Sequence, residues 1–92
     1  MMNLPSDINL RIKNDFPKRE DQEIIENIFS SLKVNERDRV FRCILFAAKG
    51  NLNMLGKLEE LAKVDYRDVI MQGEYEYPSG KRLRNFDEPF HT

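Results

Sequence analysis

The sequence predicts an all-α protein, a small bundle of four to five short helices in antiparallel hairpins with an irregular C-terminal arm. The first observation is the stretch 40–48, VFRCILFAA, which is apolar over more than half of a helix circumference and therefore needs neighbours on several sides. The second is that the flanking stretches each carry one apolar stripe at helical spacing, separated by short breaks. We expect residues 1–92 to form one domain, with the arm, residues 75–92, packed on the bundle.

The first expected helix begins near Ser6 and ends at Phe16, because the residue before Pro17 is disfavoured in a helix. Ile8 and Ile12 recur at helical spacing, but with Leu10 the same residues also alternate as in a strand. We favour the helix, since no clear partner strand follows. The second expected helix, residues 18–33, has a clean apolar arc that contains Ile24, Ile25, Ile28, Phe29 and Leu32.

The central helix is expected to begin with Asn35 as its N-cap and to stop at Gly50, a residue type common in left-handed C-terminal caps. The short break before it predicts that it is an antiparallel neighbour of the second helix. A third apolar stripe follows over residues 54–62, and Asp65 is expected to cap a last short helix. Gly56 lies off the stripe; we interpret it as a glycine without a packing role, with close approach of another backbone as the alternative.

The arm differs in character from the bundle. Tyr75 and Tyr77 alternate with acidic residues, and Pro78-Ser79-Gly80 is typical of a turn. A small hairpin and an irregular loop both fit this pattern, and we favour the loop. Phe86 and Phe90 predict that the arm lies back on the bundle, with Phe86 beside Phe46 of the central helix.

Two local patterns resemble known families. Residues 44–61, ILFAAKGNLNMLGKLEEL, resemble the helical hairpin of an ankyrin repeat, which would imply a protein-binding module. No second copy follows one period later, so we interpret the stretch as an ordinary helical hairpin. The combination of RVFRCILFAAKG, DYRDVIM and KRLRNF resembles small bacterial all-helical proteins of unassigned function. That resemblance implies a fold and no activity.

Composition excludes several classes of function. The 15 basic and 16 acidic residues are interspersed, which argues against a dedicated duplex-DNA binder. Cys43 and His91 are the only residues of their types, so no intrachain disulfide or usual zinc site can form, and we expect no metal or cofactor. We expect Cys43 to be a buried small hydrophobe, with a catalytic Cys43–His91 pair as the alternative. No signal peptide or membrane span is recognisable, so we expect a cytoplasmic protein without membrane contact.

The remaining candidate site combines basic and aromatic residues of the central helix and the arm. If the arm docks as expected, its arginines approach those of the central helix and form one basic patch. The candidate binding residues are Arg39, Arg42, Phe46, Lys49, Tyr75, Tyr77, Lys81, Arg82, Arg84 and Phe86. The alternative is that these arginines pair with nearby acids while the aromatic rings pack on the bundle.

No residue is assigned a catalytic role. The sequence therefore predicts a non-catalytic protein that binds a macromolecule, either another protein or a second copy of itself in a homodimer. Binding of RNA or single-stranded nucleic acid through the basic arm is the first alternative. An enzyme or small-ligand binder with a pocket between arm and bundle is the second.

Overall fold

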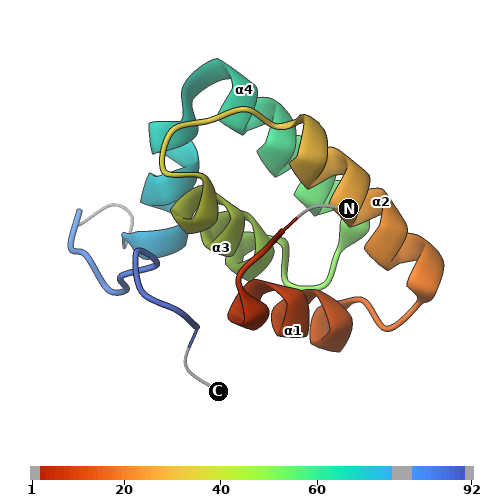
Figure 1. Cartoon of the computed structure of the whole chain (residues 1–92). Helices are drawn as coiled ribbons and strands as arrows, with labels where there is room; N and C mark the ends of the chain where they lie inside the picture. Colours follow the sequence, from red (N-terminus) through yellow and green to blue (C-terminus); the bar gives the residue numbers. More distant parts are fainter. Residues whose placement is uncertain (1–2, 76–79, 91–92) are drawn as a thin grey trace.

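The computed structural model describes residues 3–75 and 80–90, and four helices occupy these ranges (Figure 1). They are α1 (Ser6–Asp15), α2 (Arg19–Ser31), α3 (Arg37–Ala48) and α4 (Leu52–Glu74). The described residues contain no strand, only an isolated antiparallel bridge between Tyr75 and Arg82 at the base of the arm. The all-α prediction is confirmed. The predicted turn at Pro78-Ser79 lies outside the described residues, so the choice between loop and hairpin for the arm stays a prediction.

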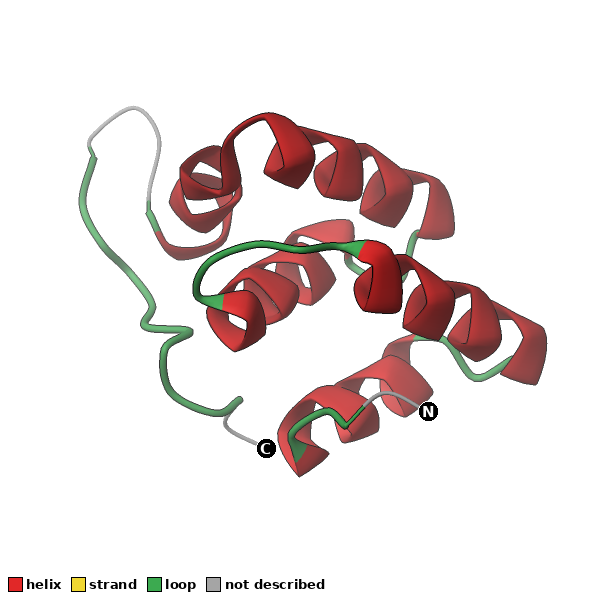
Figure 2. Ribbon diagram, turned by 45° about the horizontal axis from the view of Figure 1, so that its top comes forward, coloured by secondary structure: helices red, strands yellow, loops and turns green. Residues whose placement is uncertain are grey.

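Helix α3 is the centre of the bundle, as its composition predicted. It lies between α4 and α1 in both views (Figures 1 and 2) and packs most extensively along α4. Its apolar residues from Val40 to Leu45 are fully buried, and Ala48 is nearly so. Burial on this scale is the main stabilising term of a small domain.

The closest approach of α3 and α4 depends on one glycine. A Cβ atom built on Gly73 would lie 2.7 Å from Cβ and 2.9 Å from Cα of Cys43, closer than real atoms pack. Gly73 therefore allows the two helix backbones to approach each other beside Cys43. Gly56 has no atom within 4 Å of such a Cβ, which confirms that it has no packing role.

Helix α2 packs against α1 on one side and α4 on the other. Most of its helix–helix contacts are with those two helices. It reaches α3 through the Phe29 ring, which stacks on Phe41 with centroids 4.0 Å apart. The predicted neighbours α2 and α3 thus meet through side chains. The strand alternative for the first segment is wrong, because α1 is helical and buries Ile8 and Ile12.

The ends of α3 correct one prediction and confirm another. Asn35 is not the N-cap: the residue before the helix is Glu36, which has left-handed backbone angles and makes no capping bond. The Glu36 carboxylate instead accepts a hydrogen bond from Arg39 at 2.9 Å. At the other end Lys49 and Gly50 are both left-handed, so the helix stops where predicted.

The two helices expected after Gly50 form one helix, α4, that is kinked at Asp65. Asp65 has non-helical backbone angles (φ −156°, ψ 103°), and its Oδ1 accepts the backbone N–H of Arg67 at 3.0 Å. Asp65 therefore caps the second half of α4, as its position predicted. Asn51 caps the start of α4, with Oδ1 accepting the N–H of Met54 at 3.0 Å. None of the helices in the described ranges is long and apolar enough to cross a lipid bilayer.

Candidate functional site

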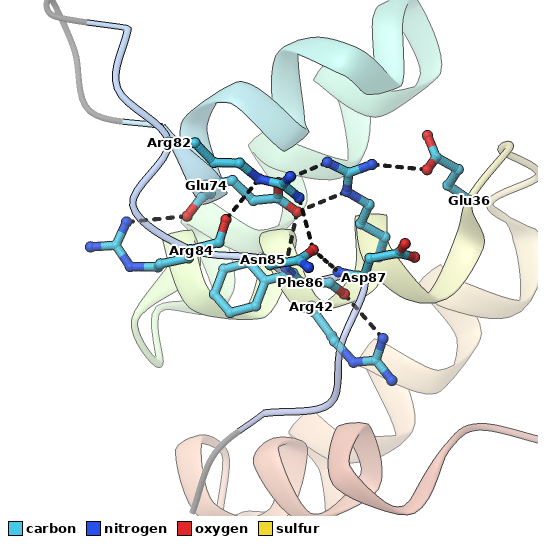
Figure 3. A network of polar contacts seen from close by, with 10 residues as sticks. Glu36, Arg42, Glu74, Arg82, Arg84, Asn85, Phe86 and Asp87 are labelled. Carbon is cyan, nitrogen blue, oxygen red and sulfur yellow. Dashed lines mark hydrogen bonds and ion pairs between the residues drawn. The ribbon is translucent and has the colours of Figure 1, made fainter.

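The arm attaches to the C-terminal end of α4, where the helix leaves carbonyl groups without helical partners. The Glu74 carbonyl oxygen accepts the N–H groups of Leu83 at 2.7 Å and Arg84 at 3.1 Å. The Arg84 guanidinium also donates to the Gly73 carbonyl at 3.3 Å (Figure 3). The end of α4 thus fixes where the arm turns back towards α3.

The Glu74 carboxylate is the polar centre of this attachment and is fully buried. Arg39 of α3 donates to both of its oxygens at 2.8 Å, a bidentate arrangement. Arg82 donates at 3.0 Å, and so does the backbone N–H of Phe86 (Figure 3). One carboxylate therefore joins α3, α4 and the arm.

A second carboxylate, Asp7, connects the arm to α1. The Arg42 guanidinium donates to its two oxygens at 2.8 and 3.2 Å and to the Phe86 carbonyl at 3.1 Å. Asp7 also accepts the backbone N–H of Phe90 at 3.0 Å. We call the four charged side chains Asp7, Arg39, Arg42 and Glu74 the arm network.

Aromatic packing accompanies these polar contacts. Phe86 is buried, with its ring centroid 5.3 Å from that of Phe46 and 5.4 Å from that of Phe90. The Arg84 guanidinium carbon lies 4.2 Å from the Phe46 centroid, and that of Arg11 lies 4.7 Å from Phe90. Such cation–π contacts cover the outer faces of rings that pack on the bundle.

The arm network keeps both carboxylates ionised. Burial by itself would raise the pKa of Glu74, but hydrogen bonds from Arg39 and Phe86 and the charges of Arg39 and Arg82 hold it below its ordinary value. The hydrogen bond from Arg42 lowers the pKa of Asp7 against the opposing effect of desolvation. Because both acids are charged and paired at neutral pH, the network holds the arm against the bundle.

The structure brings some of the predicted site residues together, but most of their arginines form ion pairs with carboxylates of the same chain. Phe86 lies against Phe46 as expected. Arg42 is buried against Asp7, and Arg39 and Arg82 share Glu74, so these three arginines follow the paired alternative. Tyr75 is half-buried in the bridge, Lys49 and Lys81 lie at the surface, and Tyr77 falls outside the described residues.

Cys43 occupies the position of a core residue. Its side chain is fully buried against Gly73, and burial together with the nearby Glu74 charge raises the pKa of the thiol to about 12. A protonated thiol is a poor nucleophile. This supports the structural role expected for Cys43; His91, its alternative catalytic partner, lies outside the described residues.

A groove of about 770 Å³ lies where the kink of α4 faces the end of α2 and the connection to α3. We call it the kink groove. Phe29, Leu32 and Ala62 are buried beneath it, and Val64 stands at its edge with 85% of its surface exposed. Basic side chains from both sides also line it, namely Lys33, Arg37, Lys63 and Arg67.

A smaller depression of about 500 Å³ lies between the start of α3 and the arm. Arginines and acids alternate around it, and the arm contributes Asp87 and Pro89. The α3 side is formed by Glu36, Arg37, Asp38, Arg39 and Arg42. No group of three or more metal-ligating side chains occurs in residues 3–75 and 80–90.

Sequence reasoning missed the acidic half of the arm network and the kink groove. Glu74 carries a usable signal, because it lies four residues after the buried Ile70 and therefore on the buried face of its helix. Asp7 and the groove have no comparable local signal. The chain matches no protein-family model, no curated protein and no solved structure.

Proposed function

We propose that this protein is a non-catalytic module that binds another protein, and that it does so in the cytoplasm. The observation that supports this best is the kink groove, in which buried apolar side chains and the almost fully exposed Val64 lie among polar and charged residues. Concave apolar surfaces with a few polar groups at their edge are the usual form of recognition sites. The buried, protonated thiol of Cys43 is consistent with a role that needs no covalent chemistry.

The groove, rather than the arm, is the surface on which the proposal rests. The arginines of the arm network already have carboxylate partners, so an external ligand would have to break internal ion pairs to use them. The Val64 side chain can lose water-exposed area on binding without disturbing the fold. Burial of one such side chain contributes about 1.5 to 3 kcal/mol.

Affinity capture from the source cell tests the proposal, with nuclease treatment of the lysate to remove partners held by nucleic acid. Val64→Gln should remove the captured protein, because the polar amide replaces the apolar contact. Met71→Gln is the matched control: Met71 is also an exposed apolar residue of α4, half exposed, but does not line the groove. Equal capture by wild type and Val64→Gln, or no specific capture at all, would contradict this proposal.

A small-ligand binder with a pocket between arm and bundle stays a prediction, because the arginines that line the depression there already pair with carboxylates. Three guanidinium groups, those of Arg37, Arg39 and Arg42, line it beside carboxylates. Guanidinium forks suit carboxylate and phosphate groups. A rise in melting temperature with inorganic phosphate or a nucleoside phosphate, lost in Arg37→Gln, would support this prediction. Nucleic-acid binding through the arm stays a prediction, which salt-dependent binding to mixed oligonucleotides would test.

A further inference from the structure

We propose that the kink groove binds a short acidic segment of another protein, one that presents an apolar side chain between its carboxylates. This inference rests on the proposed protein-binding function and specifies the chemistry of the partner. It follows from three features of the groove: the charge of its rim, the weakness of the ion pairs already present there, and the apolar side chains between the charged sides.

The rim of the groove is basic, although the whole chain has a net charge of −1. Lys33 and Arg37 lie on the side formed by the end of α2 and the start of α3, and Lys63 and Arg67 lie on the α4 side. Among the described residues that line the groove, Asp65 is the one carboxylate. An acidic ligand would therefore meet cations on both sides, which favours its approach and fixes its orientation.

Three of these cations already make ion pairs that are at least partly exposed. Lys63 lies 3.5 Å from Glu59 and 3.4 Å from Glu60, with about half of its side chain exposed. Arg37 pairs at 2.9 Å with its neighbour Asp38, and both side chains are about 40% exposed.

Arg67 donates to Asp65 at 3.0 Å, with side chains 76% and 32% exposed, and Arg37 also donates to the Asn3 carbonyl at 3.1 Å. Such pairs contribute only about 0 to 1 kcal/mol. A ligand carboxylate can replace these partners at little cost, unlike the partners in the buried arm network.

Apolar side chains lie between the basic sides of the groove, together with the polar residues Ser30 and Asn35. Phe29, Leu32 and Ala62 are buried there, Val34 and Tyr66 are half-buried, and Val64 is exposed. A volume of about 770 Å³ is suited to a few side chains of a peptide segment. One apolar side chain inserted between the lysines would cover these apolar side chains while its neighbouring carboxylates reach the rim.

This arrangement favours an acidic peptide over a nucleic-acid strand. Single-stranded nucleic acid binds along extended basic channels in which successive bases stack on aromatic rings. Here the basic residues surround one concavity with a single half-buried ring, Tyr66, at its wall. A phosphate backbone would gain the charge contacts but could not cover the apolar side chains.

The test is selection of a displayed library of random twelve-residue peptides against the full chain in low salt. We expect the enriched peptides to be net acidic with an apolar residue between carboxylates. Synthetic copies should bind at least about tenfold more weakly at high salt, or when their Asp and Glu are replaced by Asn and Gln. These two measurements need no variant of the protein itself.

Charge reversal then locates the site. Lys33→Glu combined with Lys63→Glu should weaken peptide binding about tenfold or more, because two attractive contacts become repulsive. Lys13→Glu combined with Lys57→Glu is the matched control, since both are exposed helix lysines that do not line the groove. Its binding should stay within about twofold of wild type, and thermal melts should show that both double variants fold.

Neutral or basic enriched peptides, no enriched peptides, or equal weakening by both double variants would overturn the inference. A concentration-dependent dimer that Val64→Gln dissociates would also overturn it, because the occupant would then be a second copy of the chain. Tighter binding of an oligonucleotide than of acidic peptides at the groove would also overturn the inference. Capture of a protein that depends on Val64, together with failure of acidic peptides, would leave the proposed function standing and remove only this inference.

Discussion

Replacing Glu74 by glutamine tests whether one buried carboxylate fastens the arm to the bundle. Its two oxygens accept four hydrogen bonds, and every donor is an N–H group. In Glu74→Gln one of these oxygens becomes an NH₂ group that faces donors. The variant also leaves Arg39 and Arg82 without their shared negative charge.

The expected loss of stability follows from the exposure of these partners. Removing one member of a buried ion pair costs about 3 to 5 kcal/mol. The Arg39 side chain is 18% exposed and that of Arg82 is 41% exposed, so water can partly replace Glu74. We therefore expect a loss of about 2 to 3 kcal/mol, which for a domain of this size lowers Tm by roughly 10 to 20 °C.

Thermal unfolding followed by circular dichroism measures this loss, with Glu36→Gln as the matched control. Glu36 also pairs with Arg39, at 2.9 Å, but its side chain is 43% exposed. The control should lose less than about 1 kcal/mol. A melting temperature of Glu74→Gln within about 3 °C of wild type, or an equal loss in Glu36→Gln, would refute the reasoning.

The same melting experiment can be repeated as a function of pH. The pKa values of Glu74 and Asp7 are lower in the folded protein than in the unfolded chain. Their contribution to stability is therefore complete above the unfolded values of about 4 and is lost as the pH falls through the lower folded values. Glu74→Gln should consequently show a shallower loss of stability than wild type below about pH 4.

Three other predictions concern the core and the arm. Gly73→Ala should lower the free energy of unfolding by about 1 to 3 kcal/mol, because its Cβ overlaps Cys43. Gly56→Ala should leave it unchanged or raise it by up to about 1 kcal/mol. Equal melting temperatures of the two variants would contradict the close approach of α3 and α4 at Gly73. Cys43 should react slowly with a thiol reagent in the native protein and rapidly in denaturant, and fast native labelling would contradict its burial. Deletion after Asn85 should lower Tm and expose Phe46, and an unchanged melt would show that arm docking contributes nothing.

The helices could be predicted because their signals are local. Periodic apolar residues defined α2 and α3, and Asp65 signalled the break in α4 through its capping chemistry. The same kind of local reasoning failed at Asn35, where a left-handed Glu36 paired with Arg39 takes the place of a cap. A polar residue before an apolar helix is not enough to place the cap, because the residue that precedes the helix can instead take left-handed backbone angles and pair with a side chain one turn later.

The arm network and the kink groove could not be predicted in the same way, because neither is a local property. Arg39 and Glu74 are 35 residues apart, and so are Asp7 and Arg42. With 16 acids available, residue types alone do not show which one each arginine meets. The groove depends on the direction in which α4 turns at Asp65 relative to α2, and that direction is set by the packed core.

The hydrogen bond from Phe90 to Asp7 joins residues 83 positions apart. Asp7 in the first turn of α1 and Phe90 in the arm therefore close most of the chain into one loop. The ion pair of Asp7 with Arg42 and the hydrogen bond from Arg42 to the Phe86 carbonyl lie at the same junction. Loss of the Asp7 carboxylate would therefore release the arm from α1 and remove the ionic partner of the buried Arg42 at the same time.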